Sequence, residues 1–249
     1  MANTHFWSFQ IYHKLGDALC VLYMLENIGR ATGKQSIISD SAICSQICDL
    51  MEIEYVSCEK TRQKGVRLGS LHNRYIRKRH FICSVQNYLK NKMDFNPLDC
   101  KPLIPKVKTK AKNKITLVQL DGRTIASHGV AMRCDTMRHA INHLTENRVA
   151  LIGGTDTKKY LGEFYEYRLG PLDYLLKEIQ SCDEFIGSDS GMSHLAGVLG
   201  VKSKTILLHP SVCLSDVYSM YRNTEVFCLS DSKCTHNRTK LQEMGLRFL

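Results

Sequence analysis

Phe185-Ile-Gly-Ser-Asp-Ser-Gly-Met-Ser-His-Leu-Ala-Gly-Val-Leu-Gly200 is the part of the chain from which its architecture can be inferred. It begins as a short apolar run, breaks at the small polar residues from Gly187 to Gly191, and continues as an apolar run that Gly200 ends. This order predicts a strand, a tight turn, a helix and a glycine stop. Residues 204–208 then have the pattern of the next buried strand. The stretch therefore predicts a β-turn-α-β crossover, the unit that builds parallel sheets.

The turn in this crossover has the chemistry of an anion site. Unpaired N–H groups and the helix dipole attract phosphate to the N-terminus of a helix. Ser190 or Asp189 can cap the helix, and Gly191 lets a ligand approach the backbone. Every α/β protein has several such helix starts, so the turn alone indicates no more than a capped helix.

The rest of the chain repeats the alternation of strands and helices, which favours an α/β fold with parallel sheets. We expect strands at 6–12, 36–39, 53–56, 115–120, 148–152 and 226–229, and helices at 18–30, 42–50, 81–92, 136–144, 172–180 and near the C-terminus. The predicted domains are residues 1–100 and 115–249. A lysine- and proline-rich linker at 101–114 joins them.

Basic residues are concentrated in one segment. Residues 60–114 contain sixteen Lys and Arg and two acids, Asp94 and Asp99, a charge of +14. Because the whole chain carries +10, the remainder is 10 − 14 = −4. So one-sided a segment attracts a polyanion or an anionic membrane surface.

Other features narrow the function. Eleven scattered cysteines without a CxxC pair favour reduced thiols in a cytosol, and Cys228 and Cys234 leave a metal role open. We find no run long enough to span a bilayer and no signal peptide at the start of the sequence. The phosphate-loop and dinucleotide fingerprints are absent. So is an Asp-x-Asp pair that could hold a divalent ion.

Two motifs resemble glycosyltransferase family nine, the ADP-heptose:lipopolysaccharide heptosyltransferases. The string Asp189-Ser-Gly-Met-Ser-His-Leu-Ala196 resembles the donor-site motif of that family, and Lys14-Leu-Gly-Asp17 resembles its N-terminal Gly-Asp turn. The resemblance covers residues 115–210 well and the first third weakly. The chain is shorter than is usual for the family and its middle segment is unlike it, which leaves the acceptor open.

The resemblance implies a GT-B fold of two Rossmann-like domains that face each other across a cleft. It further implies an inverting transferase whose donor is a nucleotide-diphosphate sugar, and the missing Asp-x-Asp pair favours an enzyme that needs no metal and no other cofactor. Asp17 would act as the general base, because inversion requires a carboxylate to take the proton of the attacking hydroxyl. On local grounds alone, an acid that only stabilises the helix dipole is the better interpretation of Asp17, and the second motif in the same chain is what favours catalysis. The expected donor-binding residues are Gly16, Arg123, Gly153, Gly154, Asp189, Ser190, Gly191, Met192 and His194, with Arg133 as the alternative to Arg123.

The acceptor is expected to be anionic and to contact Lys14, Arg74, Tyr75, Arg77, Lys78 and Arg79. The basic segment and its interleaved aromatics favour modified bases of DNA, as in phage-type DNA glycosylation, with the base flipped out of the duplex. Family resemblance favours lipopolysaccharide or another bacterial glycan. A non-catalytic, basic nucleic-acid-binding protein is a third hypothesis. For each of these the expected location is the cytoplasm of a bacterial or phage-infected cell.

Overall fold

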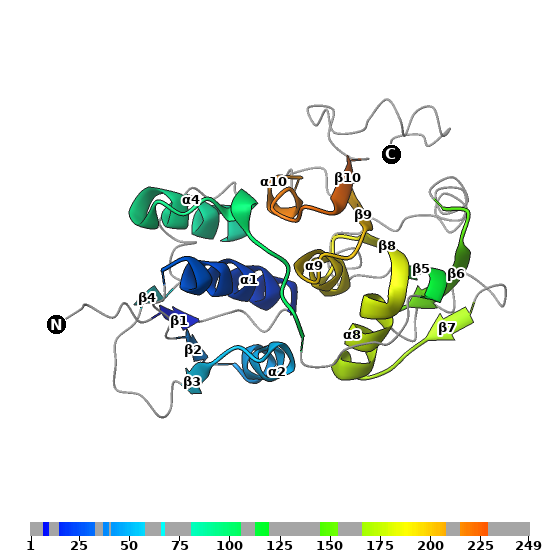
Figure 1. The fold of residues 1–249 in the computed structure, drawn as a ribbon, viewed down its shortest axis with the longest axis horizontal. Helices are drawn as coiled ribbons and strands as arrows, with labels where there is room; N and C mark the ends of the chain where they lie inside the picture. The colour runs from blue at the N-terminus through cyan, green and yellow to red at the C-terminus, as the bar shows by residue number, and fades with distance from the viewer. Residues whose placement is uncertain are drawn as a thin grey trace. The chain divides into compact units, whose positions relative to one another are not determined.

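The computed structural model describes residues 7–9, 15–32, 37–39, 41–57, 66–67, 81–105, 113–119, 145–153, 166–207 and 215–228. The chain divides into two compact units, Met1–Val107 and Lys108–Leu249 (Figure 1). Residues 106–112 of the expected linker lie outside the described residues, so the predicted domain limits stay a prediction.

The first unit contains a parallel four-stranded sheet in the order β3-β2-β1-β4. Its strands are β1 (Trp7–Phe9), β2 (Ile37–Ser39), β3 (Tyr55–Ser57) and β4 (Val66–Arg67). Trp7 aligns with Ile37 on one side and with Val66 on the other. The βαβαβ start that the sequence predicts is confirmed, whereas β4 has no counterpart among the predicted elements.

Helix α1 (Leu15–Thr32) is the core of this unit. Every side chain from Ala18 to Leu25 is at most 4% exposed, because α2 (Ala42–Met51) and α4 (Phe81–Met93) both pack against it. The polar Asn27 is tolerated in this core because its amide is satisfied. It donates to Lys101 O at 3.1 Å and accepts from Lys101 N–H at 2.7 Å. These two bonds hold the segment after the 3₁₀ turn Pro97–Asp99 against α1.

The second unit contains a parallel six-stranded sheet in the order β10-β9-β8-β5-β6-β7. Its strands are β5 (Asn113–Gln119), β6 (Arg148–Ile152), β7 (Glu166–Arg168), β8 (Cys182–Ser188), β9 (Ser203–Leu207) and β10 (Thr224–Cys228). Numbered within the unit, the order is 6-5-4-1-2-3, which is the Rossmann order 3-2-1-4-5-6 in the opposite direction.

The helices of this unit are α8 (Leu172–Ser181), α9 (Gly191–Val198) and α10 (Ser215–Tyr218). Figure 1 shows α9 beside β8 and β9, as the predicted crossover requires. Gly200 ends α9 as expected: it adopts the left-handed φ of 69°, and Val201 N–H donates to Ala196 O at 3.0 Å. This bond and that of Gly200 N–H to Gly197 O form a Schellman cap, which favours glycine.

Several predicted limits differ from the structure. The first helix begins at Leu15, so Gly16 and Asp17 lie in its first turn and not in a preceding loop. Strand β8 begins at Cys182 and ends at Ser188, which shortens the predicted turn to Asp189 and Ser190. Strand β7 and helix α10 have no counterpart among the predicted elements. The helices expected at 136–144 and near the C-terminus lie outside the described residues.

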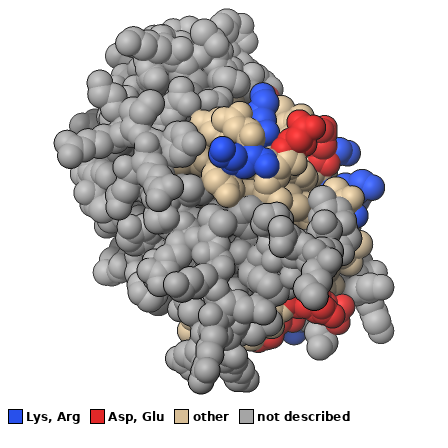
Figure 2. Space-filling model, turned by 90° about the vertical axis from the view of Figure 1, so that its left-hand side faces the viewer, with Lys and Arg blue, Asp and Glu red and all other residues tan. Residues whose placement is uncertain are grey.

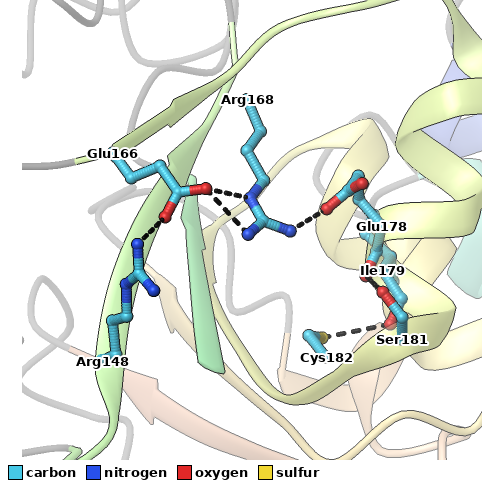
Figure 3. Close-up of polar contacts among 7 residues, drawn as sticks. All are labelled: Arg148, Glu166, Arg168, Glu178, Ile179, Ser181 and Cys182. Atoms are coloured by element: carbon cyan, nitrogen blue, oxygen red, sulfur yellow. Dashed lines mark hydrogen bonds and ion pairs between the residues drawn. The ribbon is translucent and has the colours of Figure 1, made fainter. Parts of the chain in front are cut away.

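An ion-pair network fixes the β7 edge of the sheet (Figure 3). The Arg168 guanidinium contacts the Glu166 carboxylate at 2.8 Å and also pairs with Glu178 on α8, and Arg148 on β6 contacts Glu166 at 2.7 Å. Burial acts to lower the pKa of Arg168, but hydrogen bonds to the two carboxylates outweigh it and raise that pKa. The network thus ties a three-residue edge strand to its neighbouring strand and helix.

Among the helices described here, none combines the length and the apolar character that crossing a bilayer would need.

Candidate functional site

The strand order of the second sheet alone indicates where a ligand site is expected. The chain passes from β5 to β6 and β7 in one direction and from β8 to β9 and β10 in the other. The connections therefore diverge between β5 and β8, and open parallel sheets bind ligands at the carboxyl ends of the strands beside such a switch point. Gln119 ends β5 and aligns with Gly187 of β8. The Asp189–Ser190 turn follows directly.

Ser190 closes this turn by capping α9. Its Oγ accepts the Ser193 N–H at 3.2 Å, so the capping residue is Ser190 and not Asp189. The same hydroxyl donates to Gln119 Oε1, which lies on β5 and belongs to a residue 7% exposed. One serine thus satisfies the helix start and links the two strands that flank the switch point.

Gly187 allows α9 to approach β8 closely. A Cβ at this position would lie 2.4 Å from Ser193 Oγ and 2.7 Å from a ring carbon of Phe185, both shorter than van der Waals contact. Ser193 Oγ uses this space to donate to the carbonyl of Ser188. The strand end and the first turn of the helix are therefore fixed to one another.

Asp189 is the one carboxylate in the turn, and it is held on one oxygen. The Tyr218 hydroxyl donates to Asp189 Oδ1 at 2.8 Å and accepts the Ser190 N–H at 3.3 Å. His194 Nε2 lies 3.7 Å from the same oxygen. The Asp189 side chain is 20% exposed. Its carboxylate is therefore held by protein groups at Oδ1 while part of the side chain remains accessible to solvent.

His194 is packed between two tyrosines. Its ring stacks on Tyr218 with centroids 4.5 Å apart, and its Nδ1 lies 3.1 Å from the Tyr221 hydroxyl. Tyr221 fits against α9 because residue 197 is glycine, where a Cβ would lie 2.5 Å from the tyrosine ring. His194 is only 5% exposed, so a ligand in solvent has little access to its ring. Its contribution to the site is therefore its contact with Asp189.

The start of α9 offers donors for an anion. In the described part of the chain, Ser190 Oγ takes the Ser193 N–H and Tyr218 takes the Ser190 N–H, while no acceptor is found for the N–H groups of Gly191 and Met192. Met192 as a whole residue is 8% exposed, so its side chain is buried and offers little surface to a ligand. Two free amides at the positive end of a helix can bind a phosphate.

The first unit has a comparable switch point. The chain runs from β1 to β2 and β3 on one side, while β4 lies on the other side of β1. Helix α1 follows β1, and its half-buried residues Gly16 and Asp17 occupy the first turn. A carboxylate there is favoured by the helix dipole, as expected from the sequence.

Much of the rest of the predicted site lies outside the described residues. This applies to Lys14, Arg74, Tyr75, Arg77, Lys78, Arg79, Arg123, Arg133 and Gly154. Gly153 directly follows β6, which lies two strands from β8 and therefore about 10 Å away across the sheet. The roles of all these residues stay predictions.

The described surface gives a limited view of the basic segment. Of its sixteen Lys and Arg, the side chains described are those of Lys90, Lys92, Lys101 and Lys114, and all four are exposed. On the face shown in Figure 2, blue basic and red acidic side chains lie side by side in the described part. The described side chains on this face therefore form no patch of a single charge sign.

Three residues that complete the site have no marker in the local sequence: Gln119, Tyr218 and Tyr221. Gln119 could be found only from its place at the end of β5, once the strand order is known. The tyrosines are three residues apart, a helical spacing, but their contacts are with residues 27 to 29 positions earlier in the chain.

No group of three or more His, Cys, Asp or Glu that could hold a metal occurs in the portion of the chain that is described. Two of the buried thiols there, Cys48 and Cys182, remain protonated at neutral pH. Burial raises the pKa of Cys182 to about 12, and a hydrogen bond with Cys44, together with burial, raises the pKa of Cys48. Cys228 ends β10 and Cys234 lies outside the described residues, so a metal role for this pair stays a prediction.

No known family model and no curated protein matches the sequence, but solved structures match the fold. A glycosyltransferase family 9 protein of Veillonella parvula is 13% identical, with a TM-score of 0.59 over 99% of this chain and 90% of that protein. Escherichia coli heptosyltransferase WaaC, solved with ADP, is 12% identical, with a TM-score of 0.53 over 96% of this chain and 99% of WaaC.

TibC, an iron-containing dodecameric glycosyltransferase from enterotoxigenic E. coli, is 18% identical, with a TM-score of 0.51 over 82% of this chain. The chain spans 57% of the length of TibC, which has also been solved with ADP-D-β-D-heptose. At these identities the matches show the fold alone. The chain has an α/β fold of the GT-B type, and the predicted fold class is confirmed.

Proposed function

We propose that this chain is a glycosyltransferase that moves a sugar from a nucleotide-diphosphate sugar to a hydroxyl of a bacterial glycan of the lipopolysaccharide type. The observation that carries the proposal is the turn Asp189–Ser190 at the switch point of a Rossmann-ordered sheet. Its helix start has free amides for a diphosphate, and its carboxylate can accept hydrogen bonds from sugar hydroxyls. This one turn therefore has groups that are complementary to the diphosphate and to the sugar of a nucleotide-sugar.

The donor in this proposal resembles an ADP-heptose. Glycosyltransferases of the same fold have been solved with ADP or with ADP-D-β-D-heptose, which favours this donor over other nucleotide-sugars. The Gly191 and Met192 amides would face the diphosphate, and Asp189 the sugar. The Asp189 carboxylate repels a diphosphate, so charge favours the orientation in which the sugar faces Asp189 and the diphosphate faces the amides.

The proposed reaction is a transfer with inversion. Asp17 takes the proton from the acceptor hydroxyl, whose oxygen bonds to the anomeric carbon. The bond from that carbon to the diphosphate oxygen breaks, and the nucleoside diphosphate leaves with the electron pair. General-base catalysis of this kind contributes about 10²–10⁴ in rate. A basic residue, Arg123 or Arg133, would balance the charge of the leaving diphosphate.

The proposed mechanism needs no metal ion. Asp17 takes the proton of the acceptor hydroxyl, and the amide donors together with a basic residue stabilise the negative charge of the leaving diphosphate. TibC, which shares the fold, is iron-containing, so this point requires its own test. Turnover should persist after treatment with EDTA and removal of the chelate. Activity lost with EDTA and regained with iron, magnesium or manganese would contradict the metal-independent mechanism.

Modified DNA is the second candidate acceptor. The observation in its favour is the +14 charge of residues 60–114, which suits any polyanion. The structural matches are to heptosyltransferases and related glycosyltransferases and add no support for DNA. A phosphorylated glycan accounts for the same charge, so we favour the glycan.

The test is the mass of the product. The protein is incubated with ADP-heptose, UDP-glucose or dTDP-glucose, together with lipopolysaccharide truncated at its inner core or duplex DNA with hydroxymethylated bases. We expect the glycan to gain one sugar mass with ADP-heptose, and the Asp17→Asn variant to form this product about 10²–10⁴ times more slowly. A mass gain on DNA alone would move the assignment to DNA glycosylation. Donor neither bound nor consumed in any combination would reject the transferase.

A further inference from the structure

Tyr218 lies across the Asp189–Ser190 turn. It comes from α10, and its hydroxyl makes two bonds to adjacent residues of the turn: it donates to Asp189 Oδ1 at 2.8 Å and accepts the Ser190 N–H at 3.3 Å. The side chain is fully buried, and its ring stacks on His194 with only 10° between the ring planes. The position of this hydroxyl is therefore fixed by the packing of its own ring.

These contacts distinguish the two oxygens of Asp189. Tyr218 and His194 both approach Oδ1, whereas no partner for Oδ2 is found in the described part of the chain. The side chain is 20% exposed and Oδ1 is already held, which leaves Oδ2 as the oxygen for a ligand. An ionised carboxylate oxygen only accepts hydrogen bonds, so its ligand must be a donor such as a sugar hydroxyl.

The same hydroxyl also determines which amides remain for an anion. Since Tyr218 occupies the Ser190 N–H, the amides of Gly191 and Met192 are left for a diphosphate. Tyr218 thus separates the turn into a hydroxyl-accepting side and a phosphate-binding side.

We infer that Tyr218 is a positioning residue that sets recognition of the donor sugar through Asp189. It holds Oδ1 so that Oδ2 faces the hydroxyls of the sugar, while the diphosphate binds the amides of Gly191 and Met192 and not the Ser190 N–H that Tyr218 occupies. The inference rests on the proposed function and deepens it, because it separates recognition of the sugar from recognition of the nucleotide.

Tyr218→Phe tests this role, since it removes the hydroxyl and keeps the ring that stacks on His194. A hydrogen bond to a charged group is worth enough that its loss should weaken the binding of ADP-heptose about tenfold. The affinity for ADP, which lacks the sugar, should change by less than about twofold. Tyr174→Phe is the matched control, because that hydroxyl, on α8, interacts with Glu178 and not with the turn.

The experiment is calorimetric titration of ADP-heptose and ADP into the full-length wild type, Tyr218→Phe, Asp189→Asn, the double variant and Tyr174→Phe. If Tyr218 acts through Asp189, the double variant should bind ADP-heptose about as weakly as Asp189→Asn alone. Equal losses for ADP and ADP-heptose in Tyr218→Phe, or additive losses in the double variant, would overturn the inference while the proposed function stands. A wild type that binds neither ligand would overturn both.

Discussion

Ser190→Ala removes two interactions from the turn that carries the site. The first is the cap of α9, where Ser190 Oγ accepts the Ser193 N–H at 3.2 Å, and loss of a serine cap costs about 1 kcal/mol. The second is the hydroxyl donated to Gln119 Oε1 on β5. Removing a donor from a buried acceptor costs about 1–3 kcal/mol. We therefore expect the free energy of unfolding of the second unit to fall by about 2–4 kcal/mol.

Ser41→Ala provides a matched control. Ser41 caps α2 with the same geometry, its Oγ accepting the Cys44 N–H at 3.2 Å, so its loss should cost about 1 kcal/mol. The units can be followed separately in urea. The single tryptophan, Trp7, belongs to the first unit, so its fluorescence reports on that unit, whereas circular dichroism reports on both.

The comparison has a clear negative outcome. Equal losses of unfolding free energy in Ser190→Ala and Ser41→Ala would show that the link from Ser190 to Gln119 adds nothing to stability. A circular dichroism midpoint unchanged by Ser190→Ala would also refute the cap. Either result would contradict the role of Ser190 in stabilising the connection between α9 and β5 at the switch point.

Three further predictions follow from the same contacts and charges. Asp17→Asn should lower the rate of transfer by about 10²–10⁴ and leave donor affinity unchanged in calorimetry; near-normal turnover in a folded variant would exclude Asp17 as the base. Gly191→Val should place a branched side chain at the start of α9 and weaken binding of both ADP and ADP-heptose, and unchanged affinities would put the diphosphate elsewhere. Cys182, whose pKa is raised to about 12 by burial, should resist iodoacetamide at pH 8 in the native protein and react in urea, as peptide mass mapping would show; rapid alkylation without urea would contradict its burial.

Local sequence was sufficient for the order of elements around the site. The apolar run, the small polar break and Gly200 predict strand, turn and helix because each depends on neighbours in the chain. The start of β8 was missed because Glu184 is charged yet buried in the strand. Lys204, on the next strand, lies 2.9 Å from its carboxylate, and a partner 20 residues away cannot be identified from a local pattern.

Helix α10 and the contacts of the site escaped prediction for the same reason. Four residues carry too few apolar positions for a helical period, and α10 is held by Tyr218, whose partner Asp189 lies 29 residues earlier. The link between Ser190 and Gln119 spans 71 residues and exists only because β5 and β8 are neighbours in the sheet. The sequence thus predicted the turn and left its cap open between Ser190 and Asp189, while the choice of Ser190 and the residues that orient the turn depend on the tertiary fold.

Hydrogen exchange of the full-length protein with and without ADP-heptose tests most directly whether the β8–α9 turn binds the donor. The amides of Gly191 and Met192 should become protected when the diphosphate binds, so peptides that cover residues 188–195 should exchange more slowly. ADP alone should give most of this protection, because it carries the same diphosphate. Saturating ADP-heptose that slows exchange in other peptides but leaves 188–195 unchanged would contradict the account.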